Sequence, residues 1–99
     1  MAEYEVRLLP AAFSDLDEIF DYILTENPEA AVRTLENIMQ SLGRLKNHPY
    51  SGPPLLGRSL NRFNFRMLIV SPYIAFYRVI DSEVLIYRVL LKPSRVLFL

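Results

Sequence analysis

Three β-rich runs between residues 63 and 91 constrain the fold of this chain more than any other feature. The stretch FNFRMLIVSPYIAFYRVIDSEVLIYRVLL is interrupted only at Ser71-Pro72 and at Asp81-Ser82. Connections this short can join neighbouring strands only as antiparallel hairpins, and β-branched and aromatic residues fill the runs. The stretch therefore predicts an antiparallel β-meander. A turn centred on Asp81-Ser82 predicts four cross-strand pairs: Val79 with Val84, Tyr77 with Ile86, Phe76 with Tyr87, and Ile74 with Val89.

Two amphipathic helices are predicted before the meander, and they meet at Asn27-Pro28. Asn27 can cap the second helix, and Pro28 suits its first position, where no N–H is needed. The second helix should end near Lys46. Apolar residues recur at helical spacing in both segments: Phe13, Leu16, Ile19, Phe20 and Ile23 in the first, and Ala31, Leu35, Ile38, Leu42 and Leu45 in the second. Burying about ten such side chains, at roughly 1.5–3 kcal/mol each, favours a helical hairpin that covers one face of the sheet.

A further short strand is expected over residues 4–9, where the pattern starts as an alternation and stops at Pro10. This strand should add to the meander as an edge strand. The element order is then β-α-α-β-β-β, so we predict an α+β fold, an antiparallel β-sheet with an N-terminal helical hairpin packed on one face. With 99 residues, 52% of them hydrophobic, the chain is expected to form a single domain over residues 1–99.

Composition narrows the possible functions. Lys plus Arg equals Asp plus Glu at 11 each, so no bulk positive field argues for direct nucleic-acid binding, and none is expected. The absence of cysteine excludes disulfides and thiolate metal sites. The sequence shows neither an N-terminal signal pattern nor an apolar run long enough to cross a bilayer, so we expect a cytoplasmic protein without a membrane partner.

The sequence lacks the residues that the common catalytic sites require. There is no Gly-rich phosphate loop and no His pair for zinc. The single His48 precedes Pro49 at a helix end, which favours a capping or loop histidine over a catalytic one. The acids of the first helix spread around it, which favours a solvated face over a metal or acid-base group: Asp15, Asp17, Glu18 and Asp21. We therefore expect no catalytic residue, no metal and no cofactor.

Three arginines, Arg66, Arg78 and Arg88, lie inside the otherwise apolar strands. Each must reach solvent along its stem or pair with a carboxylate. In the predicted register Arg78 and Arg88 point to opposite faces of the sheet, so the three arginines cannot all serve one site. Arg66 is a candidate to line a partner-facing groove, whereas Arg78 either faces a partner or pairs with a helix acid, Asp17 or Asp21.

At this point the residues resemble a family. The loop HPYSGPPLLG and the following FRMLIVSPYIAFYRVIDSEVLIYRVL look like the ParE/RelE superfamily of bacterial toxin-antitoxin toxins. RelE-type nucleases carry an arginine after the tyrosine of the first hairpin, where this chain has Ile74 after Tyr73, and a basic segment followed by a tyrosine after the last strand. Here that segment reads LKPSRVLFL, so the chain looks closer to the ParE branch.

The resemblance implies the toxin of a type II toxin-antitoxin pair that inhibits DNA gyrase by protein binding and is neutralised in a hetero-oligomer by a ParD-like antitoxin. Two alternatives stay open, a RelE-like ribosome-dependent mRNA endonuclease and a non-toxic relic that still binds an antitoxin. We expect the antitoxin to bind Arg66 and, on the sheet face left uncovered by the helices, the apolar residues Ile74, Phe76, Leu85 and Val89. The target would meet Arg88, Lys92 and Arg95, and the apolar end at residues 96–99 should be buried, either against this domain or in a partner.

Overall fold

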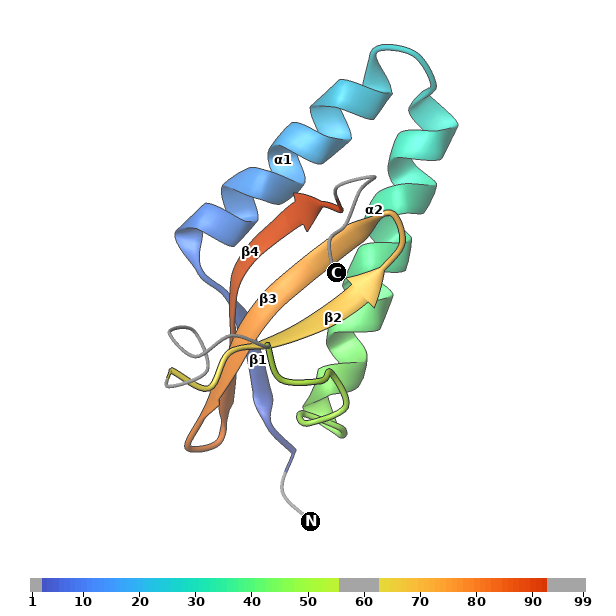
Figure 1. Ribbon diagram of the computed structural model, residues 1–99. Coiled ribbons are helices and arrows are strands. Elements are labelled where there is room, and N and C mark those ends of the chain that lie inside the picture. Colours follow the sequence, from blue (N-terminus) through green and yellow to red (C-terminus); the bar gives the residue numbers. More distant parts are fainter. Residues whose placement is uncertain (1–2, 56–62, 93–99) are drawn as a thin grey trace.

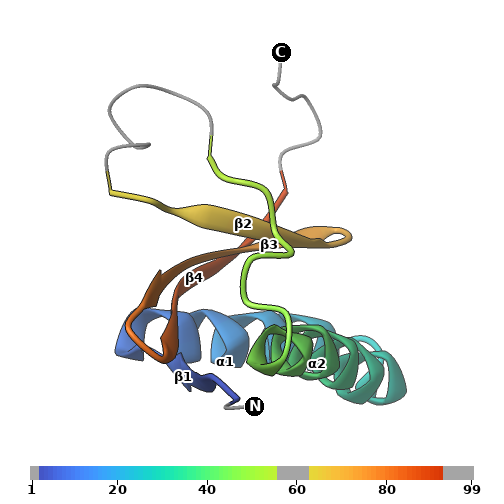
Figure 2. The same ribbon diagram turned by 90° about the horizontal axis from the view of Figure 1, so that it is seen from below.

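The computed structural model describes residues 3–55 and 63–92, and it has the predicted element order (Figure 1). The elements are β1 (Glu5–Leu8), α1 (Pro10–Leu24), α2 (Pro28–Gly43), a 3₁₀ turn η1 (Arg44–Lys46), β2 (Arg66–Val70), β3 (Tyr73–Ile80) and β4 (Glu83–Leu91). Both helices lie on one face of the sheet, and no helix of the described residues lies on the opposite face (Figure 2). The predicted α+β fold is confirmed. No helix in these residue ranges is long and apolar enough to cross a membrane.

Local sequence signals fix the ends of the helices. Pro10 is the first residue of α1, and Pro28 is the first of α2. The Asn27 side chain accepts a hydrogen bond from the Ala30 N–H at 3.1 Å, which satisfies one of the free amides at the start of α2. The predicted cap is therefore confirmed.

The sheet has the strand order β1-β4-β3-β2. β2, β3 and β4 form the predicted antiparallel meander, and β1 adds to it as an edge strand that runs parallel to β4. A parallel pair needs a long connection, and here both helices, β2 and β3 lie between β1 and β4 in the chain. The sheet is therefore mixed, although most of its pairing is antiparallel, and β4, the last strand along the chain, lies inside it.

A β-bulge divides the β3–β4 pairing. Near the turn the predicted register is confirmed, with Val79 opposite Val84 and Tyr77 opposite Ile86. The register then shifts between Phe76 and Tyr77, so the predicted pairs Phe76–Tyr87 and Ile74–Val89 are wrong. The observed pairs there are Phe76 with Arg88, Ala75 with Val89 and Ile74 with Leu90. An extra residue in one strand reverses the side-chain alternation beyond it.

The bulge decides where Val89 lies. We expected this residue on the uncovered sheet face, but it is 1% exposed and belongs to the core between the sheet and the helices. Tyr77, Ile86 and Leu42 are also fully buried in this core. Val89 therefore supports the packing of the helical hairpin and is removed from the candidate binding surface.

Candidate functional site

Asp15 and Arg88 join α1 to the open part of β4. The Asp15 carboxylate accepts hydrogen bonds from Arg88 Nε at 2.7 Å, from Arg88 Nη2 at 2.9 Å and from the Val89 N–H at 2.9 Å. β1 pairs with β4 only as far as Ile86, so Asp15 supplies an acceptor just beyond the end of β1. The Arg88 hydrogen bond lowers the pKa of the Asp15 carboxyl, and burial, which raises it, is outweighed.

This pairing changes the expectation for Arg88 and for the acidic helix. Asp15 is a buried structural carboxylate, whereas Asp17, Glu18 and Asp21 are exposed, as the solvated-face interpretation predicts. The Arg88 side chain is still 49% exposed, so part of the guanidinium remains accessible to another molecule. Lys92 is exposed after β4, and Arg95 lies outside the residues that the structure describes.

Arg66 lies on the helix-side face of the sheet, because it pairs in register with the buried Tyr77. Its Nη1 donates hydrogen bonds to the Gly52 carbonyl at 2.7 Å and to the Tyr50 carbonyl at 3.3 Å. Its guanidinium also lies 4.9 Å from the centre of the Tyr50 ring. Arg66 therefore holds the loop after α2 in position, and it lies on the sheet face opposite to Ile74.

A second contact fixes the same loop. The Gly52 N–H donates to the Tyr77 hydroxyl at 2.9 Å in a buried position. A Cβ atom on Gly52 would collide with the Met67 carbonyl oxygen and lie 2.7 Å from the Tyr77 hydroxyl, so only glycine fits there. Burial raises the pKa of Tyr77, and the Gly52 N–H partly offsets that effect. The phenol is therefore a neutral structural group.

The uncovered sheet face carries an apolar strip made by Ile69, Ile74 and Leu90, one residue from each of three neighbouring strands. Ile74 pairs with Ile69 on β2 and with Leu90 on β4. Ile69 is 50% exposed and Leu90 is 38% exposed. We call these three residues the sheet strip. The structure thus places the predicted Ile74 on an open apolar surface, although its neighbours there were not predicted.

Beside the sheet strip, aromatic rings and arginines form a second patch on the same face. An open hollow of about 310 Å³ is lined by Leu55, Phe65, Phe76, Tyr87 and Arg88, so Arg88 borders this face and its predicted position on the face opposite Arg78 is wrong. Phe65 and Tyr87 pack edge to face, with ring centres 5.0 Å apart. Arg78 lies over the Phe65 ring at 5.6 Å, and its Nη1 is 3.4 Å from the Tyr87 hydroxyl. The alternative pairing of Arg78 with a helix acid is wrong, because the helices cover the other face.

Leu85, the remaining predicted antitoxin residue, is partly buried on the uncovered face. It pairs with Arg78 on one side and with Arg7 on the other. Of the residues predicted to bind an antitoxin, the structure therefore brings Ile74, Phe76 and Leu85 together on one face. It separates Arg66 and Val89 from them.

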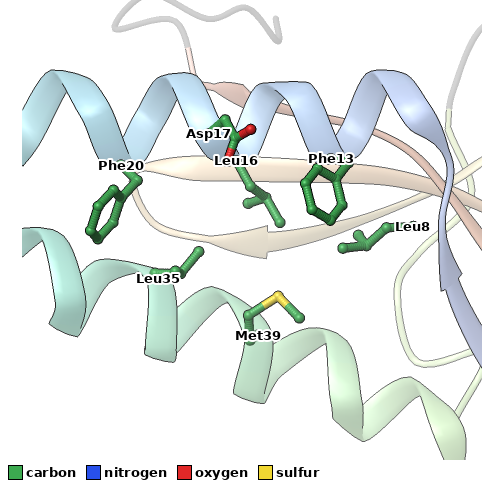
Figure 3. Close-up of a pocket in the computed structure, with 7 residues that line it drawn as sticks. All are labelled: Leu8, Phe13, Leu16, Asp17, Phe20, Leu35 and Met39. Carbon is green, nitrogen blue, oxygen red and sulfur yellow. The ribbon is translucent and has the colours of Figure 1, made fainter.

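A groove between the two helices was missed in the sequence. It encloses about 390 Å³ and is lined by Leu8, Phe13, Leu16, Asp17, Phe20, Leu35 and Met39 (Figure 3). We call this set the hairpin groove. Phe13 is 59% exposed and Met39 is 43% exposed, although helical spacing placed Phe13 in the stripe that faces the sheet. The sequence did contain a signal for this groove. The apolar stripe of the first helix is wider than a helix needs when it packs against one layer only.

The part of the chain that the structure describes contains no group of three or more His, Asp or Glu side chains able to hold a metal ion. His48 is exposed, and its backbone N–H donates to the Arg44 carbonyl at the end of the 3₁₀ turn. These positions agree with a loop histidine.

Comparison with known proteins identifies the family. Residues 6–92 match the family described as the ParE toxin of the type II toxin-antitoxin system, parDE. A chain of the chromosomal ParDE TA system from P. aeruginosa superposes with a TM-score of 0.75 at 25% identity, covering 91% of this chain and 97% of that one. A chain of the toxin-antitoxin complex RelBE2 from Mycobacterium tuberculosis gives 0.62 at 24% identity, covering 91% and 99%, which shows a shared fold. No curated protein sequence matches this chain. Because the family match spans nearly the whole fold, the chain belongs to the ParE toxin family of type II toxin-antitoxin systems.

Proposed function

We propose that this chain is the toxin of a type II pair, that a ParD-like antitoxin silences it by wrapping the domain, and that DNA gyrase is its target. Family membership supports the toxin role, and both similar structures come from toxin-antitoxin systems. The observation that carries the antitoxin part is the presence of two open apolar surfaces, the hairpin groove and the sheet strip, on different sides of the fold.

The two surfaces call for an extended partner. The hairpin groove runs between α1 and α2 and suits the apolar face of a helix, which inserts side chains at helical spacing (Figure 3). The sheet strip lies on the face without helices, so one compact partner cannot cover both surfaces. A chain that lays a helix in the groove and continues around the sheet edge would cover both, which is how a small antitoxin could hold this domain.

Inhibition by binding is favoured over RNA cleavage. A ribonuclease needs several cationic groups around the phosphate and an acid-base group close to them. Here Arg66 is bound to loop carbonyls on the helix side, and Arg88 is paired with Asp15. Ile74 also stands where RelE-type nucleases carry an arginine. The exposed Lys92 and the accessible part of Arg88 remain as the proposed contacts to the target.

The antitoxin proposal is tested by adding a charge to the hairpin groove. Met39→Glu places a carboxylate among apolar side chains that a partner helix would cover, and we expect binding of the antitoxin encoded beside this gene to weaken at least about tenfold. Gln40→Glu is the matched control, because it adds the same charge at the next, exposed position outside the groove lining. Equal affinities for both variants, measured by calorimetry, would remove the groove from the interface.

The gyrase proposal is tested with purified toxin in a DNA supercoiling assay. We expect gyrase to be inhibited and the inhibition to disappear when the antitoxin is added first. Growth inhibition in cells without any effect on supercoiling would assign a different target. Cleavage of mRNA in a translation extract would favour the nuclease alternative instead.

A further inference from the structure

Arg78 lacks a full set of hydrogen-bond acceptors among the residues that the structure describes. Its Nε is buried without a hydrogen-bond partner among the described residues. Its one hydrogen bond there, from Nη1 to the Tyr87 hydroxyl, is long at 3.4 Å. Residues 1–2, 56–62 and 93–99 contain no Asp or Glu, so every acidic side chain of the protein lies in the described part, and none of them pairs with Arg78.

The other strand arginines show the contrast. Arg88 holds a buried carboxylate, Arg7 pairs with Glu83 at 3.2 Å, and Arg66 donates to two carbonyl oxygens. Burying a guanidinium N–H without an acceptor is costly, and the Phe65 ring and the long contact to the Tyr87 hydroxyl leave the Arg78 Nε without an acceptor among the described residues. Such a group is typical of a site that is completed by another molecule.

The residues around Arg78 indicate what kind of partner group would fit beside it. The guanidinium lies over Phe65, whose ring also lines the hollow of about 310 Å³ together with Phe76 and Tyr87. The hollow is therefore apolar with a cation at its border. Aromatic residues and arginine are the usual anchors at the centre of protein interfaces.

We propose that this hollow and Arg78 form an anchor site for an acidic peptide segment, in which one apolar side chain fills the hollow and an adjacent Asp or Glu pairs with Arg78. This site deepens the proposed function, because the segment would belong to the antitoxin as it crosses the uncovered sheet face. A carboxylate can accept two parallel hydrogen bonds from a guanidinium, including one from the buried Nε.

Charge favours a peptide over a nucleic acid at this site. Nucleic-acid binding depends on several cations that follow the phosphates, and aromatic rings then stack the bases. Among the described residues around the hollow, Arg78 is a cation without a carboxylate and the neighbouring Arg88 is paired with Asp15, and the chain as a whole has a formal net charge of +0. One carboxylate matches this arrangement better than a run of phosphates.

The test uses Arg78→Met, which keeps the apolar stem and removes the charge, with Arg7→Met as the control on the same sheet face. Affinity for the antitoxin encoded beside the gene is measured by calorimetry, and the melting temperature of the free toxin is measured in parallel. We expect Arg78→Met to weaken binding at least about tenfold without lowering the melting temperature, whereas Arg7→Met binds within about twofold of the wild type. A purely structural arginine would lower the melting temperature instead, which would overturn the proposal.

Two further experiments distinguish a carboxylate partner from a nucleic acid at this site. Replacing one acidic residue of the antitoxin by Lys should restore binding to Arg78→Glu, and failure of every such replacement would rule out a carboxylate partner. Binding of a fluorescent single-stranded oligonucleotide of about 15 nucleotides that is lost in Arg78→Met would assign the site to nucleic acid. Unchanged antitoxin affinity in Arg78→Met refutes this site alone, whereas no antitoxin binding by the wild type refutes the proposed function with it.

Discussion

Replacing Asp15 by Ala should destabilise the fold by an amount that follows from its hydrogen bonds. Asp15 is 7% exposed, and its carboxylate is the acceptor for the buried Val89 N–H. Leaving such a donor without a partner costs about 1–3 kcal/mol. For a domain of this size that corresponds to a loss of about 5–20 °C in melting temperature. Asp15→Asn should lose less, because an amide oxygen can still accept from Val89.

The pH dependence of the melting temperature gives an independent measure of how much Asp15 stabilises the fold. The pKa of Asp15 lies below its ordinary value of 3.8, so the stabilisation is present above that pH and is lost as the pH falls through the lowered pKa. In melting curves followed by circular dichroism, the difference between the wild type and Asp15→Asn should be smaller at about pH 3 than at about pH 7. Asp21→Ala removes an exposed carboxylate from the same helix and is the control. If Asp15→Ala and Asp21→Ala have the same melting temperature at neutral pH, the hydrogen bond from the Val89 N–H of β4 to Asp15 does not stabilise the fold.

The remaining predictions concern the loop, the chemistry and the chain end. Gly52→Ala should melt earlier than the wild type, whereas Gly43→Ala, with nothing within 4 Å of its new Cβ, should gain about 0.5–1 kcal/mol in chemical denaturation. Tyr77→Phe should lose about 1–3 kcal/mol in the same assay, because the Gly52 N–H loses its acceptor. Purified protein should cleave no mRNA on ribosomes; cleavage that disappears in Arg66→Ala would contradict this. Truncation after Pro93 should lower the melting temperature if the apolar end folds back, or abolish gyrase inhibition alone if it binds the target.

Local patterns were sufficient for most of the fold. The breakers at Ser71-Pro72 and Asp81-Ser82 fall between the observed strands, and Asn27-Pro28 marks the start of α2, with Asn27 as its cap and Pro28 as its first residue. These signals act over a few residues, so no knowledge of the tertiary structure is needed. Asp81 also adopts a positive φ of 56°, which an aspartate in a tight turn tolerates better than most residues.

The candidate site depended on contacts that no local pattern reveals. The β-bulge lies in the pairing of β4 with β3, and it shifted the partners predicted for Phe76 and Ile74 and moved Val89 to the core. The pairing of Asp15 with Arg88 joins residues 73 positions apart. The open side of Phe13 likewise depends on the angle between the helices, since the periodicity of one helix does not indicate how far its neighbour covers it.

The inner position of β4 has a consequence for how this toxin is made. β1 is synthesised early but its pairing partner is β4, the last strand to leave the ribosome. At about 5–20 residues per second, the N-terminal strand and the helices wait for several seconds before the sheet can close. During that interval the surfaces that would engage a target are not yet assembled. The proposed target contacts Arg88 and Lys92 lie on or just after β4, so they reach their final positions only when this last pairing forms.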